Sequence, residues 1–212
     1  MQENFISDLL KKPAWMLFII SWLFYLGSLF LYCQMVWDTN TYLSDFKGTD
    51  FETVLSNCRK MDMIRYVLSP VWVLAISFFI WLLIKAGLFV KQIEFSNMQL
   101  FKIVFLGFIL ISMSSWVKSV WLILFQSGYT TNEAKYFFPD SIVTLIDTTG
   151  MNETKIKALA HINLFQLAFV VFTGWQLATN STLKFINSIV LVLCTYGLFF
   201  TLLELFKVQI FS

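Results

Sequence analysis

The sequence places ionisable side chains within runs of residues that are otherwise apolar. Lys118 lies in the stretch SSWVKSVW, inside an apolar run over residues 103–125, and Glu204 lies in a second such run near the C-terminus. An ionisable group at the depth of a bilayer is costly unless it finds a partner. Two such residues can therefore form a structural ion pair, or they can bind a substrate or a proton or contact a partner subunit.

The neighbours of Lys118 indicate which way its side chain points. If residues 100–126 form a helix, one side of that helix carries small and polar residues next to the lysine. Small residues mark the face of a membrane helix that packs against other helices. We therefore expect Lys118 to point into a helix bundle, on a face shared with Gly107, Ile111, Ser114 and Ser115.

Two other apolar runs carry polar residues at a similar depth. In the C-terminal run, Gly197 and Glu204 belong to a series at spacings of three and four, which places them on one helical face. The run before it begins with His161 and two amides. We therefore expect one polar cluster in the outer half of the membrane, made of Lys118, Glu204, His161, Asn163, Gln166, Ser114 and Ser115.

Three interpretations of this cluster stay open. Lys118 and Glu204 can form a buried ion pair that fixes helix register, helped by the amides of the neighbouring helix. The cluster can instead bind a substrate or a proton, or contact a partner subunit. In the third interpretation Glu204 pairs with Lys207, three residues along the same helix, while Lys118 extends to the membrane surface.

The composition indicates the solvent in which these groups lie. The 212 residues are 58% hydrophobic and only 13% charged, against about 45–50% apolar and about 25% charged in soluble domains. This composition predicts an integral membrane protein. The net charge of +2 is too small to indicate nucleic-acid binding.

Five apolar runs are long enough to cross a bilayer core about 30 Å thick, which takes roughly 20 residues of helix. We therefore predict one all-α transmembrane domain over residues 1–212. Two outer connections carry shorter apolar patterns, over residues 51–61 and in FFPDSIVTLID, which predict interfacial helices. The predicted spans cover residues 14–36, 66–90, 100–126, 159–178 and 185–206.

Lysines in the short connections predict the orientation, because positive residues accumulate on the cytoplasmic side. The N-terminus is therefore expected in the cytoplasm, and an odd number of spans puts the C-terminus outside. The lysines that support this orientation are Lys11, Lys12, Lys85, Lys91, Lys102 and Lys184.

The motifs of membrane enzymes are missing from the sequence. A metalloprotease needs paired histidines, but His161 is the only histidine in the chain. The three cysteines form no CxxC pair, and no Gly-rich phosphate-binding loop is present. We therefore expect no catalytic residue, no metal and no cofactor.

The order of these segments resembles the bacterial branch of the Yip (Ypt-interacting protein) domain family. The likeness lies in KKPAWMLF before the first span, in KQIEFSNMQLFKIVFLGF, and in INLFQLAFVVFTGWQLATNSTLKFINSIVLV, where Gly174 is similar to a family glycine. The eukaryotic Asp-Leu-Tyr-Gly-Pro signature and the long N-terminal region are absent, so Rab GTPase partners are not implied. The resemblance implies a five-helix, non-enzymatic protein that associates with other membrane proteins.

Together these features predict an accessory or scaffold subunit in the bacterial inner membrane. Its expected partners are lipid and other integral membrane proteins, with a transporter as the leading candidate and further copies of this chain as another. The alternative is a small transporter or channel subunit that uses Lys118, Glu204 and His161 directly.

Overall fold

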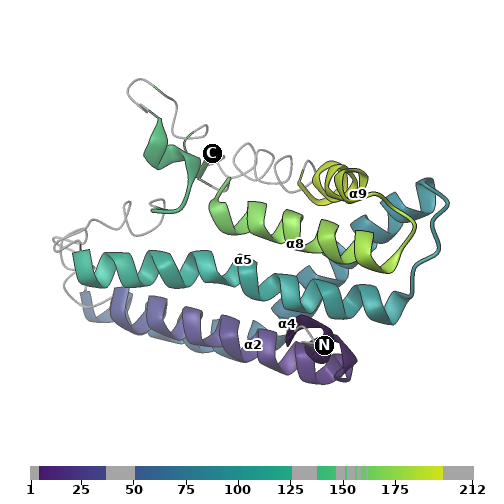
Figure 1. Ribbon diagram of the computed structural model, residues 1–212. Coiled ribbons are helices and arrows are strands. Elements are labelled where there is room, and N and C mark those ends of the chain that lie inside the picture. Colours follow the sequence, from purple (N-terminus) through teal and green to yellow (C-terminus); the bar gives the residue numbers. More distant parts are fainter. Residues whose placement is uncertain are drawn as a thin grey trace.

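The computed structural model describes residues 5–36, 51–125, 138–146 and 162–197, together with positions 151, 156, 159 and 160. This part of the chain is helical and contains no β-strand, apart from one isolated antiparallel bridge between Ser141 and Asn163. The longer helices lie side by side in an elongated bundle with α5 at its centre (Figure 1).

The bundle begins with a short helix and continues through three long ones. Pro13, with φ −64°, precedes the second helix, a position where proline is well tolerated because the missing N–H would have no helical partner. The elements are α1 (Phe5–Lys11), α2 (Ala14–Leu31) continued by the π-helical η1 (Tyr32–Val36), α4 (Phe51–Val90), α5 (Asn97–Phe125), the 3-10 turn η2 (Ile142–Leu145), α8 (Leu164–Asn180) and α9 (Phe185–Val192) continued by the π-helical η3 (Leu193–Gly197).

Three of the described helices are long and apolar enough to cross a membrane, which is compatible with a multi-pass membrane protein. They cover Ala14–Gln34, Ser56–Val90 and Asn97–Phe125, and they correspond to the first three predicted spans. The fourth predicted span starts later than expected, at Leu164, because the side chain of Asn163 caps the helix by accepting a hydrogen bond from the backbone N–H of Gln166 at 2.8 Å. The fifth starts at Phe185 as predicted, and its part beyond Gly197 lies outside the described residues.

The prediction of a separate interfacial helix over residues 51–61 is wrong, because these residues are the first turns of α4.

Helix α4 also continues through Pro70, which has no N–H to donate to the carbonyl of Tyr66. The hydroxyl of Ser69 donates to that carbonyl at 2.7 Å, and it accepts from Trp22 Nε1 of α2 at 2.8 Å. The side chain of Ser69 therefore satisfies the backbone at the proline and ties α4 to α2.

In the second outer connection, the predicted short helix is the single turn η2.

Close approach of the helices depends on small residues. A Cβ atom added to Gly107 of α5 would lie 2.5 Å from the ring of Phe169 in α8. One added to Gly174 of α8 would lie 3.0 Å from the backbone of Ile189 in α9. These contacts bring α8 between α5 and α9, and the buried apolar residues between α4, α5, α8 and α9 form the main core.

We expect Gly174→Ala to destabilise the protein, although alanine favours a helix by about 1 kcal/mol over glycine. The added Cβ meets backbone atoms of Ile189, which can move only if α9 moves. Thermal unfolding in detergent measures the effect, with Val171→Ala, on the exposed side of α8, as the control. A higher midpoint for Gly174→Ala than for the wild-type protein would contradict this packing.

Candidate functional site

Lys118 is buried in α5, with 4% of its surface exposed. Its ammonium group lies 4.1 Å from the centroid of the Phe138 ring and 5.2 Å from that of the Tyr32 ring. Both distances are within the range of a cation–π interaction, which gains strength where water is excluded. The charge of Lys118 is therefore held between aromatic rings from η1 and from the segment that leads into η2.

The segment with Phe138 also brings a carboxylate to this place. Both oxygens of Asp140 are buried, and neither has a hydrogen-bond partner in the described part of the chain. Burial raises the pKa of Asp140, and the positive charge of Lys118 offsets this only in part. Desolvation therefore dominates over attraction at this carboxyl group.

Backbone hydrogen bonds hold this segment against the start of α8. The N–H of Leu164 donates to the carbonyl of Asp140, and the N–H of Ile142 donates to the carbonyl of Ile162, both at 3.0 Å. These bonds form the bridge between Ser141 and Asn163. Asp140 is therefore positioned by α8, whereas Lys118 is positioned by α5, and the site lies where the two helices meet.

The structure brings together only some of the residues predicted for the polar cluster. Ser114 is buried one turn before Lys118, and Ser115 is half-buried. Asn163 is buried as the cap of α8, and Gln166 is half-buried in the first turn of that helix. Glu204 and His161 lie outside the described residues, so the Lys118–Glu204 pair and the cluster's use by a transporter stay predictions.

The predicted cluster does not include Tyr32, Phe138 or Asp140. A signal for Asp140 was present, since it is an acidic residue inside the apolar segment FFPDSIVTLID, which is too short to span a membrane. An acidic group in such a segment needs a cationic partner as much as a lysine in a span needs an anionic one.

The arrangement can act as an electrostatic tie between helices, and it can exchange a proton at a buried carboxyl group. A metal site, in contrast, needs several converging ligands. The described residues contain no group of three His, Cys, Asp or Glu side chains that could hold a metal ion.

We expect coupling between Lys118 and Asp140 in a double-mutant cycle. Lys118→Met removes the charge near the buried carboxylate, and Asp140→Asn in that background removes the group left without its cation. The double variant should therefore be more stable than Lys118→Met alone, with a coupling free energy of about 1 kcal/mol because Asp140 is only partly buried. Urea unfolding in detergent gives the four stabilities, and strictly additive losses would exclude an interaction.

The raised pKa of Asp140 predicts a dependence of stability on pH. Its folded state binds the proton more tightly than the unfolded chain does, so the unfolding free energy should fall as the pH rises from about 4 through the raised pKa. Asp140→Asn should flatten this part of the profile. Thermal unfolding between about pH 4 and about pH 7 checks this, and parallel profiles for wild type and Asp140→Asn would contradict it.

Comparison of this chain with protein-family models, with curated proteins and with solved structures finds no match. The resemblance to the Yip family therefore stays a prediction from the sequence.

Proposed function

We propose that this protein is a non-enzymatic accessory or scaffold subunit that holds another integral membrane protein through the outer half of α4. The proposal is supported by the length of this helix. Its 40 residues extend over about 60 Å at 1.5 Å per residue, roughly twice the thickness of a bilayer core. The span predicted over residues 66–90 leaves residues 51–65 of α4 outside the core, and Val67 and Leu68 lie at its boundary.

The first part of α4 exposes an apolar surface beside charged residues. Arg59, Lys60, Asp62 and Arg65 mark this part of the helix as lying at or beyond the membrane surface. The exposed apolar side chains at the same level, which we call the α4 outer face, are Met61, Met63, Ile64, Val67 and Leu68, each between 50% and 71% exposed.

The α4 outer face is the observation that carries the proposal. Apolar residues of α4 further along, such as Phe78 and Phe89, are exposed as well, but lipid chains can cover them. Those of the outer face lie among charges, where a contiguous apolar patch marks a protein interaction site. A groove of about 520 Å³ along it is lined by Lys60, Met63, Ile64, Val67 and Leu68.

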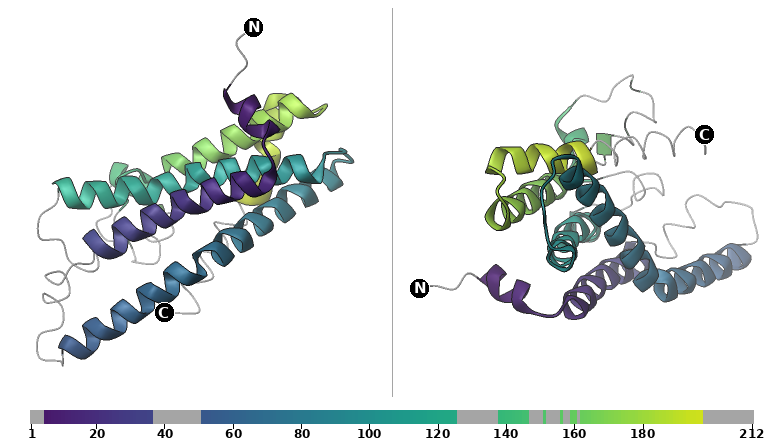
Figure 2. Two further views of the ribbon diagram at one scale, coloured as in Figure 1. Left: turned by 90° about the horizontal axis from the view of Figure 1, so that it is seen from below. Right: turned by 90° about the vertical axis from the view of Figure 1, so that its right-hand side faces the viewer.

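The direction of α4 leaves this surface accessible. Its first turns diverge from α2 and α5, whereas its last turns pack against the core (Figure 2). The α4 outer face has none of the small residues that bring the other helices together. Its side chains are those of methionine, isoleucine, valine and leucine. Methionine is common at surfaces that adapt to a partner.

The proposal includes five membrane crossings in the bacterial inner membrane, with the N-terminus in the cytoplasm and the C-terminus outside. In it α8, which is 17 residues long, forms the fourth crossing, and α9 begins the fifth. A helix slightly shorter than the bilayer core can be accommodated by local thinning of the membrane. The Yip-like assignment and a transporter as the partner belong to the same proposal.

A photo-reactive amino acid at Val67 tests the proposal in cells that produce the protein at its native level. We expect Val67 to cross-link one integral membrane protein, and a second probe at Met63 to cross-link the same one. Phe89, which is 80% exposed near the other end of α4, is the matched control and should cross-link lipid only.

A charge on the outer face completes the test. Val67→Lys should abolish co-purification of the cross-linked protein in mild detergent without lowering the thermal midpoint, since Val67 is 71% exposed. Cross-links to lipid alone from Val67 would exclude a docking surface. Cross-links only to another copy of this chain would replace the accessory role with self-association.

A further inference from the structure

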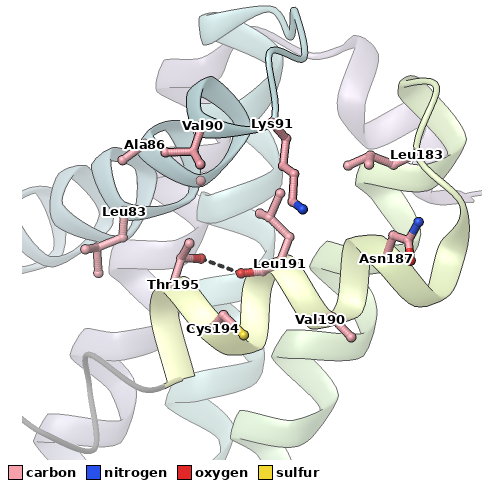
Figure 3. Close-up of a pocket in the computed structure, with 11 residues that line it drawn as sticks. Leu83, Ala86, Val90, Lys91, Leu183, Asn187, Val190, Leu191, Cys194 and Thr195 are labelled. Atoms are coloured by element: carbon pink, nitrogen blue, oxygen red, sulfur yellow. Dashed lines mark hydrogen bonds between the residues drawn. The ribbon is translucent and has the colours of Figure 1, made fainter.

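A second groove lies at the opposite end of α4, between the last turns of that helix and α9. Its volume is about 840 Å³, within the roughly 300–1,000 Å³ of small-molecule sites. Apolar and small side chains form most of its wall, and Lys91 and Asn187 supply polar groups (Figure 3). The residues that line it include Leu83, Ala86, Gly87, Lys91, Asn187 and Thr195.

The polar groups of the groove lie at one end of the bundle. Lys91 directly follows the last residue of α4, and Asn187 lies in the first turn of α9. A hydrogen bond of 2.7 Å from Gln99, at the start of α5, to Asn180, at the end of α8, shows that the helices turn at the same end. The groove therefore has its polar mouth where the chain leaves the apolar zone.

The groove narrows away from this mouth. A Cβ atom at Gly87 would lie 2.6 Å from Thr195 Cγ2, so α4 and η3 are nearly in contact there. Between Lys91 and Leu83 the lining extends over eight residues of α4, or about 12 Å of helix. This shape offers an apolar slot that starts at a cationic group.

Lys91 differs from two other lysines at this end. The ammonium of Lys85 donates to the carbonyl of Phe95, and that of Lys102 donates to the carbonyl of Leu10, both at 2.9 Å. Lys91 makes no hydrogen bond or ion pair with any residue that the structure describes. Its side chain points from the end of α4 into the space in front of α9 (Figure 3).

We infer that this groove binds one anionic phospholipid, with an acyl chain between α4 and α9 and the headgroup phosphate at Lys91 and Asn187. Charge complementarity favours this occupant over a neutral lipid. Basic pockets between membrane helices are known to hold anionic headgroups. The length of the apolar slot favours a lipid over a free phosphate ion, because a phosphate ion makes no favourable contact with apolar walls.

Native mass spectrometry of the full chain, purified in mild detergent and mixed with phosphatidylglycerol or phosphatidylcholine, tests the inference. We expect one phosphatidylglycerol to be retained in preference to phosphatidylcholine. Lys91→Gln should weaken its retention about fivefold, as the loss of one lysine near a lipid surface predicts. Ala86→Phe, which fills the slot from an exposed position, should reduce retention of both lipids at this site.

The control is Lys12→Gln, an exposed lysine between α1 and α2 that does not line the groove. Equal loss of lipid in Lys12→Gln and Lys91→Gln would overturn the inference, because it would show non-specific attraction. Equal retention of the two lipids would also overturn it, as would displacement of the lipid by inorganic phosphate alone. A lipid-free dimer that is broken by Ala86→Phe would assign the groove to a second copy of the chain.

Discussion

The packing of neighbouring helices against α5 is the constraint on which the rest of the structure depends. On one side the hydroxyl of Ser21 in α2 donates to the carbonyl of Phe105 at 2.6 Å, which draws α2 against the backbone of α5. On the other side Gly107 leaves room for the ring of Phe169 in α8. Because both contacts use almost no side-chain volume, α5 lies in the centre of the bundle, and Lys118 on the same helix is carried into the interior.

Several buried polar groups of the bundle are satisfied within their own helix, whereas the carboxylate of Asp140 is not. Several serine and threonine hydroxyls donate to carbonyls one turn earlier, as Ser112 does to Phe108 at 2.9 Å, so that they need no partner elsewhere. The oxygens of Asp140 are buried without such a bond in the described part of the chain. Near Asp140, the ammonium of Lys118 and the aromatic rings around it provide the electrostatic stabilisation that water provides at an exposed site. The contact between α5 and the segment with Asp140 therefore differs from an ordinary packed interface.

The two ends of α4 have different surroundings, and this difference gives the helix two roles. Its last turns contribute Ile80, Ile84 and Leu88 to the core, and Trp81 stacks on Phe101 of α5 with ring centroids 4.6 Å apart. Its first turns are covered on fewer sides and carry charges beside apolar residues. A rigid helix that is anchored at one end can present the other end to a partner, because helical hydrogen bonds keep its direction without further contacts.

The sequence by itself determined the helical class, the first three long helices and the start of the fifth predicted one at Phe185, because continuous apolar length is a local property. It also placed Lys118 on a small and polar stripe, although it could not show what that stripe faces. Only the tertiary structure decided that Asp140 and Phe138 lie beside Lys118, because that pairing depends on backbone bonds between the η2 segment and the start of α8. The extension of α4 back to Phe51 was also decided there. Within this helix the carbonyl that Pro70 leaves without a donor is satisfied by Ser69, whose hydroxyl accepts a hydrogen bond from Trp22 of another helix.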